Sequence, residues 1–126
     1  MDRNTKCEER IGEALRSTLE DISEALDEGT LFDLGLGFDY VAPETFNDQN
    51  EGYWRYQLSW GGPSDEFRFF ADDTEDRSPG VEYWFLDWFD GASRYLRGSD
   101  EELLHTVWNN FMDVGSVKHE YEEGMK

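Results

Sequence analysis

The chain has 126 residues, and its 30 acidic and 11 basic side chains give a net charge of −19. Only 37% of the residues are hydrophobic but 16% are aromatic, and large rings can build a core from few positions. This balance argues against a disordered chain, which combines high charge with few aromatic residues. It also disfavours direct binding to nucleic acid or to an anionic membrane surface, because such binding depends on basic side chains.

The length predicts a single domain over residues 1–126, with frayed tails at 1–6 and 116–126. Cys7 is the only cysteine, so no disulfide can form within the chain, which suits a reducing compartment. We find no apolar run of the length of a signal peptide or of a membrane span. We therefore expect a cytoplasmic protein.

The first predicted helix covers residues 8–28. Its apolar positions recur every three or four residues on one stripe and are Ile11, Leu15, Leu19, Ile22 and Leu26. The opposite face carries six carboxylates, namely Glu13, Glu20, Asp21, Glu24, Asp27 and Glu28. Acids in a last turn oppose the helix dipole, which favours cations there. This charge therefore serves something other than the stability of the helix.

The centre of the chain predicts three strands, at residues 53–60, 66–71 and 81–88, with an irregular edge strand at 34–40 before them. Apolar and polar side chains alternate along these stretches, as in strands with one buried face. Arg55 and Arg68 should share the outer face, flanked by Glu66 and Asp65, and take part in cross-strand pairs on a solvated face. Residues 53–71 carry two acids and two bases, so we expect this neutral region to be an aromatic scaffold.

The loop at residues 72–80 is the second concentration of charge, and its acids are Asp72, Asp73, Glu75 and Asp76. A calcium loop is the alternative, but the spacing lacks the pattern of an EF-hand, so we expect solvated charge. A turn or short helix should follow at residues 89–97. Residues 99–112 predict a helix that begins with a capping box formed by Ser99 and Glu102.

The sequence carries little that predicts catalysis. His105 and His119 have no spacing that suits a metal site, one cysteine cannot build a zinc site, and no nucleophile elbow is present. With thirty acids, a pair of carboxylates can be drawn almost anywhere and predicts nothing. We therefore expect no enzyme activity, no cofactor and no metal.

The segments 53–68 and 84–92 are similar in style to small acidic proteins carried by plasmids and phages. The resemblance is to a class, the antirestriction, anti-CRISPR and other DNA-mimic proteins. It covers size and composition rather than a functional motif, so it assigns no catalytic residue. It implies an inhibitor from a mobile genetic element that engages a nucleic-acid-binding protein.

We predict an α+β fold, with a three- or four-stranded antiparallel β-meander and an N-terminal and a C-terminal helix packed on it. The predicted function is a non-enzymatic acidic protein that binds a basic protein partner as a nucleic-acid mimic. The predicted contacts are Glu13, Glu20, Asp21, Glu24, Asp27 and Glu28 on the first helix, with Asp72, Asp73, Glu75 and Asp76 on the loop.

Two alternatives stay open. One is an acidic accessory or oligomerising protein, a homodimer included, whose charge only keeps it in solution. The other is a small ligand-binding or enzymatic domain, with a pocket between the aromatic sheet and residues 91–97 in which Arg94 meets Tyr83 or His105. The turn at residues 60–64, flanked by Trp60, has a lesser claim as a contact site.

Overall fold

In a computed structural model of the chain, the residues described are 7–35, 37–45, 49, 51–59, 63–71, 79–87 and 90–124. Four helices and five strands follow one another in these ranges. In order they are α1 (Cys7–Glu28), α2 (Leu31–Leu34), β1 (Gly37–Val41), β2 (Tyr53–Ser59), β3 (Pro63–Phe70), β4 (Gly80–Asp87), β5 (Asp90–Tyr95), α3 (Gly98–Asp113) and α4 (Ser116–Gly124).

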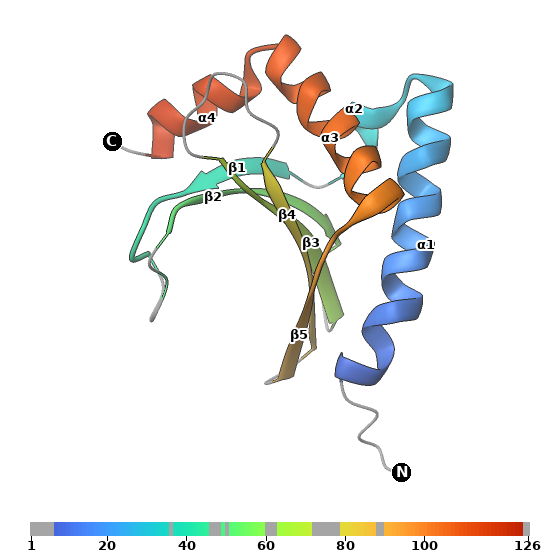
Figure 1. The fold of residues 1–126 in the computed structure, drawn as a ribbon. Coiled ribbons are helices and arrows are strands. Elements are labelled where there is room, and N and C mark those ends of the chain that lie inside the picture. Colours follow the sequence, from blue (N-terminus) through green and yellow to red (C-terminus); the bar gives the residue numbers. More distant parts are fainter. Residues whose placement is uncertain are drawn as a thin grey trace.

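The strands form one antiparallel sheet in the order β1-β2-β3-β4-β5, so each strand pairs with its neighbour in the sequence. Figure 1 shows α1, α3 and α4 on one side of a strongly curved sheet, whose other side carries no helix. α1 packs against β4 and β5, whereas α4 packs against β1. The helical layer therefore covers both ends of the meander.

The core lies between the sheet and the helices, because alternate side chains of each strand point to that side. The buried rings of the strands on this side are Trp54, Tyr56, Phe67, Phe69, Tyr83 and Phe85, and α3 adds Leu104, Val107, Trp108 and Phe111. The ring of Trp108 lies 5.3 Å from that of Trp54 and 5.1 Å from that of Phe69. Burying each such side chain contributes roughly 2 kcal/mol, so a few rings supply much of the stability.

The predicted α+β class and antiparallel meander are confirmed, and β1 is an edge strand. It covers Gly37–Val41 rather than the predicted residues 34–40, because Leu34 belongs to helix α2. The sheet has one strand more than the three or four predicted. The addition is β5, at residues for which we predicted a turn or short helix, and that prediction was wrong. The stretch Asp90–Tyr95 has no β-branched side chain, so its pairing with β4 outweighs its weak local preference.

The expected frayed tail at residues 116–126 is instead helix α4, as far as Gly124. Val117 is buried, and its carbonyl oxygen accepts a hydrogen bond of 3.0 Å from Trp54 Nε1. Tyr121 packs its ring 4.8 Å from that of Tyr40. These contacts hold the acidic C-terminal segment on the sheet. Residues 1–6, the other expected tail, lie outside the described residues.

Helix α3 begins at Gly98, one residue before the predicted cap. Arg97 occupies the N-cap position, and no side chain caps the helix by a hydrogen bond. The predicted capping box of Ser99 and Glu102 does not form, because Ser99 already lies within the first turn.

Candidate functional site

Six carboxylates occupy one side of α1, and all six are exposed. At about 100° per residue they fall within an arc of about 120°, opposite the buried side of the helix. We call this surface the acidic face of α1; it consists of Glu13, Glu20, Asp21, Glu24, Asp27 and Glu28. The structure thus brings together all the helix residues that the sequence predicted as contacts.

The buried side of α1 packs against the sheet, and residues in its N-terminal half bind to side chains of the sheet. Cys7, Ile11, Ile22 and Ala25 are buried, and the backbone N–H of Cys7 donates to Asp90 Oδ2 at 2.8 Å. Arg10 forms an ion pair with Asp87, and its guanidinium lies 4.9 Å from the centre of the Phe85 ring. Burial, with Asp90 and Asp87 nearby, raises the pKa of the Cys7 thiol. α1 is therefore a fixed platform for its acids.

The acidic face of α1 makes no ion pair within the part of the chain that the structure describes. The basic side chains paired with carboxylates there are Arg10, Arg55 and Arg68, together with His105 near Glu101. Arg16 lies at one border of the acidic face and is exposed. The six carboxylates thus face solvent with no ion-pair partner in the part of the chain that the structure describes.

The predicted loop contacts Asp72, Asp73, Glu75 and Asp76 lie outside the described residues, as do Trp60, Gly61 and Gly62 of the aromatic turn. The candidate site that the structure describes is therefore the helical half of the predicted surface.

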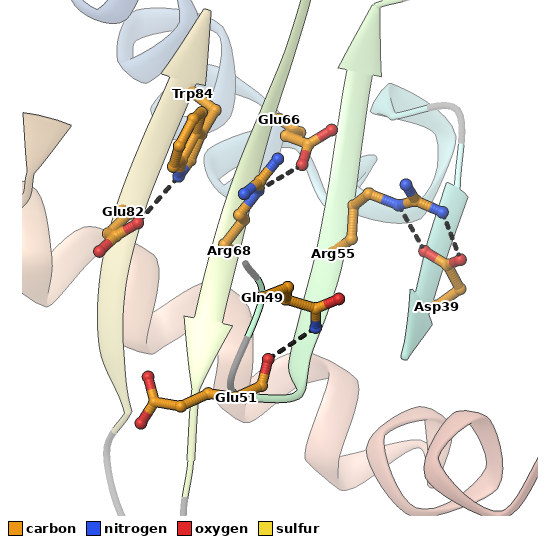
Figure 2. Close-up of polar contacts among 8 residues, drawn as sticks. All are labelled: Asp39, Gln49, Glu51, Arg55, Glu66, Arg68, Glu82 and Trp84. Carbon is orange, nitrogen blue, oxygen red and sulfur yellow. Dashed lines mark hydrogen bonds and ion pairs between the residues drawn. The ribbon is translucent and has the colours of Figure 1, made fainter. Parts of the chain in front are cut away.

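The side of the sheet that faces away from the helices has a different arrangement of charge, which Figure 2 shows. Arg55 forms two hydrogen bonds to Asp39, of 3.0 and 2.8 Å, which raise the pKa of the guanidinium. Arg68 donates to Glu66 at 2.6 Å, and Trp84 Nε1 donates to Glu82 at 2.8 Å. We call this surface the open face, defined by Asp39, Arg55, Glu66, Arg68, Glu82 and Trp84.

Cross-strand register explains the pairing of Arg55 with Asp39 on the open face. Asp39, Arg55, Arg68 and Glu82 are directly opposite one another on four successive strands, so two arginines stand between two acids. The guanidinium of Arg68 also lies 3.9 Å from the centre of the Trp84 ring and 4.7 Å from that of Tyr53. Arg55 thus makes the expected cross-strand pair, with Asp39, whereas Arg68 pairs with Glu66 on its own strand. These charges belong to the scaffold.

Asp65 is a buried carboxylate that sequence reasoning misplaced. We expected it on the outer face beside the arginines, but it points toward α1. It accepts hydrogen bonds from Thr18 Oγ1 at 3.0 Å, from Tyr83 OH at 2.7 Å and from Ser59 Oγ. Burial, and then the bond to Asp65, raise the pKa of Tyr83. The alternation of Phe67 and Phe69, extended back by two residues, would have placed Asp65 correctly.

The pocket expected from Arg94 with Tyr83 or His105 is not formed by those residues. The hydroxyl of Tyr83 is buried against Asp65, and His105 Nε2 lies 2.8 Å from the carbonyl oxygen of Pro79. Arg94 instead lines a groove of about 460 Å³ on the flank of α1, with Gly12, Leu15 and Leu19. Among the described residues, no three His, Cys, Asp or Glu side chains are grouped so that they could hold a metal ion.

No family model matches the chain, and neither the curated proteins nor the solved structures gave a significant match. No helix in the described ranges has both the length and the apolar character that crossing a bilayer requires.

Proposed function

We propose that the protein is a non-enzymatic binding protein whose acidic α1 face engages a basic protein, as a nucleic-acid mimic that inhibits a nucleic-acid-binding protein. The observation that carries the proposal is the exposure of six carboxylates on one side of α1, with no ion-pair partner among the described residues. Such a face attracts a cationic surface and repels phosphates.

The spacing of these charges resembles that of a phosphate backbone. From Glu13 to Glu28 the helix axis rises about 22 Å at 1.5 Å per residue, which gives about one carboxylate per 4.5 Å. One DNA strand carries a charge about every 3.4 Å of its axis. A groove of arginine and lysine side chains that holds one strand can therefore meet a comparable linear density of charge on α1.

The local energetics favour the same proposal. Asp27 and Glu28 lie in the last turn of α1, which contains no basic residue. Carboxylates at this end oppose the helix dipole by roughly 0.3–1 kcal/mol each, so they do not serve the helix. A basic partner removes this repulsion when it binds, and the relief adds to its affinity.

The proposal extends to the four loop acids, Asp72, Asp73, Glu75 and Asp76, as a second contact segment. It includes a cytoplasmic location, where the basic nucleic-acid-binding proteins of a cell are accessible and a lone Cys7 thiol stays reduced. An inhibitor carried by a mobile genetic element is the biological role that suits this class.

Two variants with the same change in charge test the role of α1. The first is the α1 triple variant, Glu24→Gln, Asp27→Asn and Glu28→Gln; the second is the control triple variant, Glu102→Gln, Asp113→Asn and Glu122→Gln, at exposed positions of α3 and α4. Binding to a panel of basic nucleases and DNA-binding proteins is measured over a salt series. We expect the α1 triple variant to lose affinity and salt dependence, whereas the control keeps both.

Duplex DNA should compete with the protein for the same partner. Binding that ignores ionic strength, or an equal loss in both triple variants, would show that the acidic face of α1 is not the contact. Full biological activity in the α1 triple variant would favour the accessory role, in which charge only maintains solubility.

A further inference from the structure

A groove runs along the flank of α1 next to the acidic face. It has a volume of about 460 Å³ and lies between α1, β5 and the beginning of α3. Leu15 and Leu19 give it an apolar lining, and Ser23 adds a hydroxyl. Glu20 belongs both to the groove and to the acidic face of α1, so a partner bound to that face reaches the groove without moving.

Two arginines line this groove, Arg16 from α1 and Arg94 from β5. Both are exposed, and neither takes part in an ion pair within the described ranges. Arg55 and Arg68, by contrast, are bound to carboxylates on the open face. Two guanidinium groups without such partners, in a chain of net charge −19, therefore share one groove.

Gly12 keeps the groove open. A Cβ atom at this position would meet only Arg94 Nη1, at 3.8 Å, which is an ordinary contact. Packing therefore does not require glycine there, although glycine in a helix interior is less favourable than alanine. The missing side chain leaves space beside the guanidinium of Arg94.

We propose that this groove receives an aromatic side chain of the basic partner, an inference that rests on the proposed function. The flat guanidinium groups of Arg16 and Arg94 can stack on a ring, while Leu15 and Leu19 bury its edge. Glu20 and Asp100 repel an incoming anion and favour lysine or arginine beside the ring. The acidic face supplies attraction over distance, and the groove supplies a buried anchor of the kind that dominates many interfaces.

The test uses three capped heptapeptides as probes, each of six lysines around a central tryptophan, alanine or glutamate. Calorimetry measures their affinity for the full chain over a salt series. We expect the tryptophan peptide to bind about ten-fold more tightly than the alanine peptide, a ratio that persists at high salt because stacking and burial are little screened.

Gly12→Leu fills the groove and should bring the ratio close to one, while the salt dependence stays. Gly12→Ala is the matched control, and it should keep most of the preference for tryptophan. The α1 triple variant should show the opposite pattern: its peptide binding depends less on salt, while the ratio of the tryptophan to the alanine affinity is unchanged. Thermal unfolding of each variant checks that the fold is intact.

Three outcomes would overturn the inference: a ratio near one in the parent chain, a preference for tryptophan that survives Gly12→Leu, and tightest binding of the glutamate peptide. The last would mean that the two arginines take a carboxylate. Failure of all three peptides to bind in a salt-dependent manner would count against the proposed function instead, so the two failures are distinguishable.

Discussion

The acidic face of α1 and the open face of the sheet are both rich in charge, but they use it differently. On the open face, each arginine is held by a carboxylate and Glu82 accepts a hydrogen bond from Trp84. On α1, six carboxylates stand exposed with no ion-pair partner among the described residues. Paired charge therefore belongs to the scaffold, whereas the exposed acids of α1 form the surface that we propose for a basic partner.

Burial explains why the two faces differ. The Glu66 side chain is only 5% exposed, and a carboxylate removed from water needs a cation and hydrogen bonds in place of its hydration. The acids of α1 keep their hydration, so the fold requires no cation beside them. Changing the charge on each face should consequently affect stability with opposite sign.

The largest effect should follow from Arg68→Met on the open face. This change leaves the Glu66 carboxylate buried without its cation and removes the guanidinium from the rings of Trp84 and Tyr53. We expect a loss of about 3 kcal/mol in the free energy of unfolding, measured in urea. Adding Glu66→Gln to Arg68→Met should recover part of the loss. A change below about 0.5 kcal/mol, typical of exposed positions, would contradict the distinction between the two faces.

At high pH a buried tyrosine can lose its proton, which places a negative charge inside the fold. Burial raises the pKa of Tyr56 from 10.0 to about 12. The neutral phenol is thus favoured in the folded state, so its contribution is complete below pH 10 and is lost as the pH rises toward 12. Two pKa units correspond to a loss of about 2–3 kcal/mol.

Tyr56→Phe isolates this effect, because the Tyr56 hydroxyl is buried with no hydrogen-bond partner among the described residues. We expect the variant to match the parent near neutral pH and to lose less stability between pH 10 and 12. Urea unfolding at each pH provides the measurement. Equal alkaline sensitivity in the two chains would show that Tyr56 does not titrate in this range.

Periodicity was sufficient to predict α1, its acidic face and the strands of the central meander. These features depend on local alternation, and Ile11, Ile22, Phe67 and Phe69 occupy the buried positions that the pattern predicted. The β5 strand could not be predicted in this way, because its sequence has weak strand preference and pairing with β4 determines its structure.

The groove beside α1 was also beyond sequence reasoning. From the sequence we expected a pocket in which Arg94 would meet Tyr83 or His105. The strand conformation of β5 turns Arg94 toward α1 instead, where its guanidinium lies over Gly12. A site made by residues 82 positions apart depends on tertiary packing, which a single sequence does not specify.

Neutralising the end of the acidic face should stabilise the protein, the reverse of the effect on the open face. Asp27→Asn with Glu28→Gln removes two anions from the negative end of the helix dipole. We expect the free energy of unfolding to rise by about 0.5–1 kcal/mol at low salt, with the gain disappearing at high salt. Glu9→Gln, at the opposite end of α1, is the control and should lower stability slightly. A loss of stability in the double variant would mean that these acids help to hold the fold.

The smallest effect should come from Arg55→Met, which separates pairing from burial within the open face. Arg55 and Asp39 form two good hydrogen bonds, but their side chains are 27% and 45% exposed. Water can therefore solvate the Asp39 carboxylate when Arg55 is removed. The expected loss in the free energy of unfolding is about 0.5 kcal/mol, and salt reduces it further.

A double-mutant cycle with Asp39→Asn measures the interaction itself, and Arg68→Met gives the reference for a buried pair. If Arg55→Met lowered the free energy of unfolding as much as Arg68→Met, pairing would stabilise the open face whether or not the pair is buried. The exposed acids of α1 would then differ from the acids of the open face only in having no ion-pair partner. The contrast between these two arginines thus decides whether burial is what distinguishes the paired charges of the open face from the exposed acids of α1.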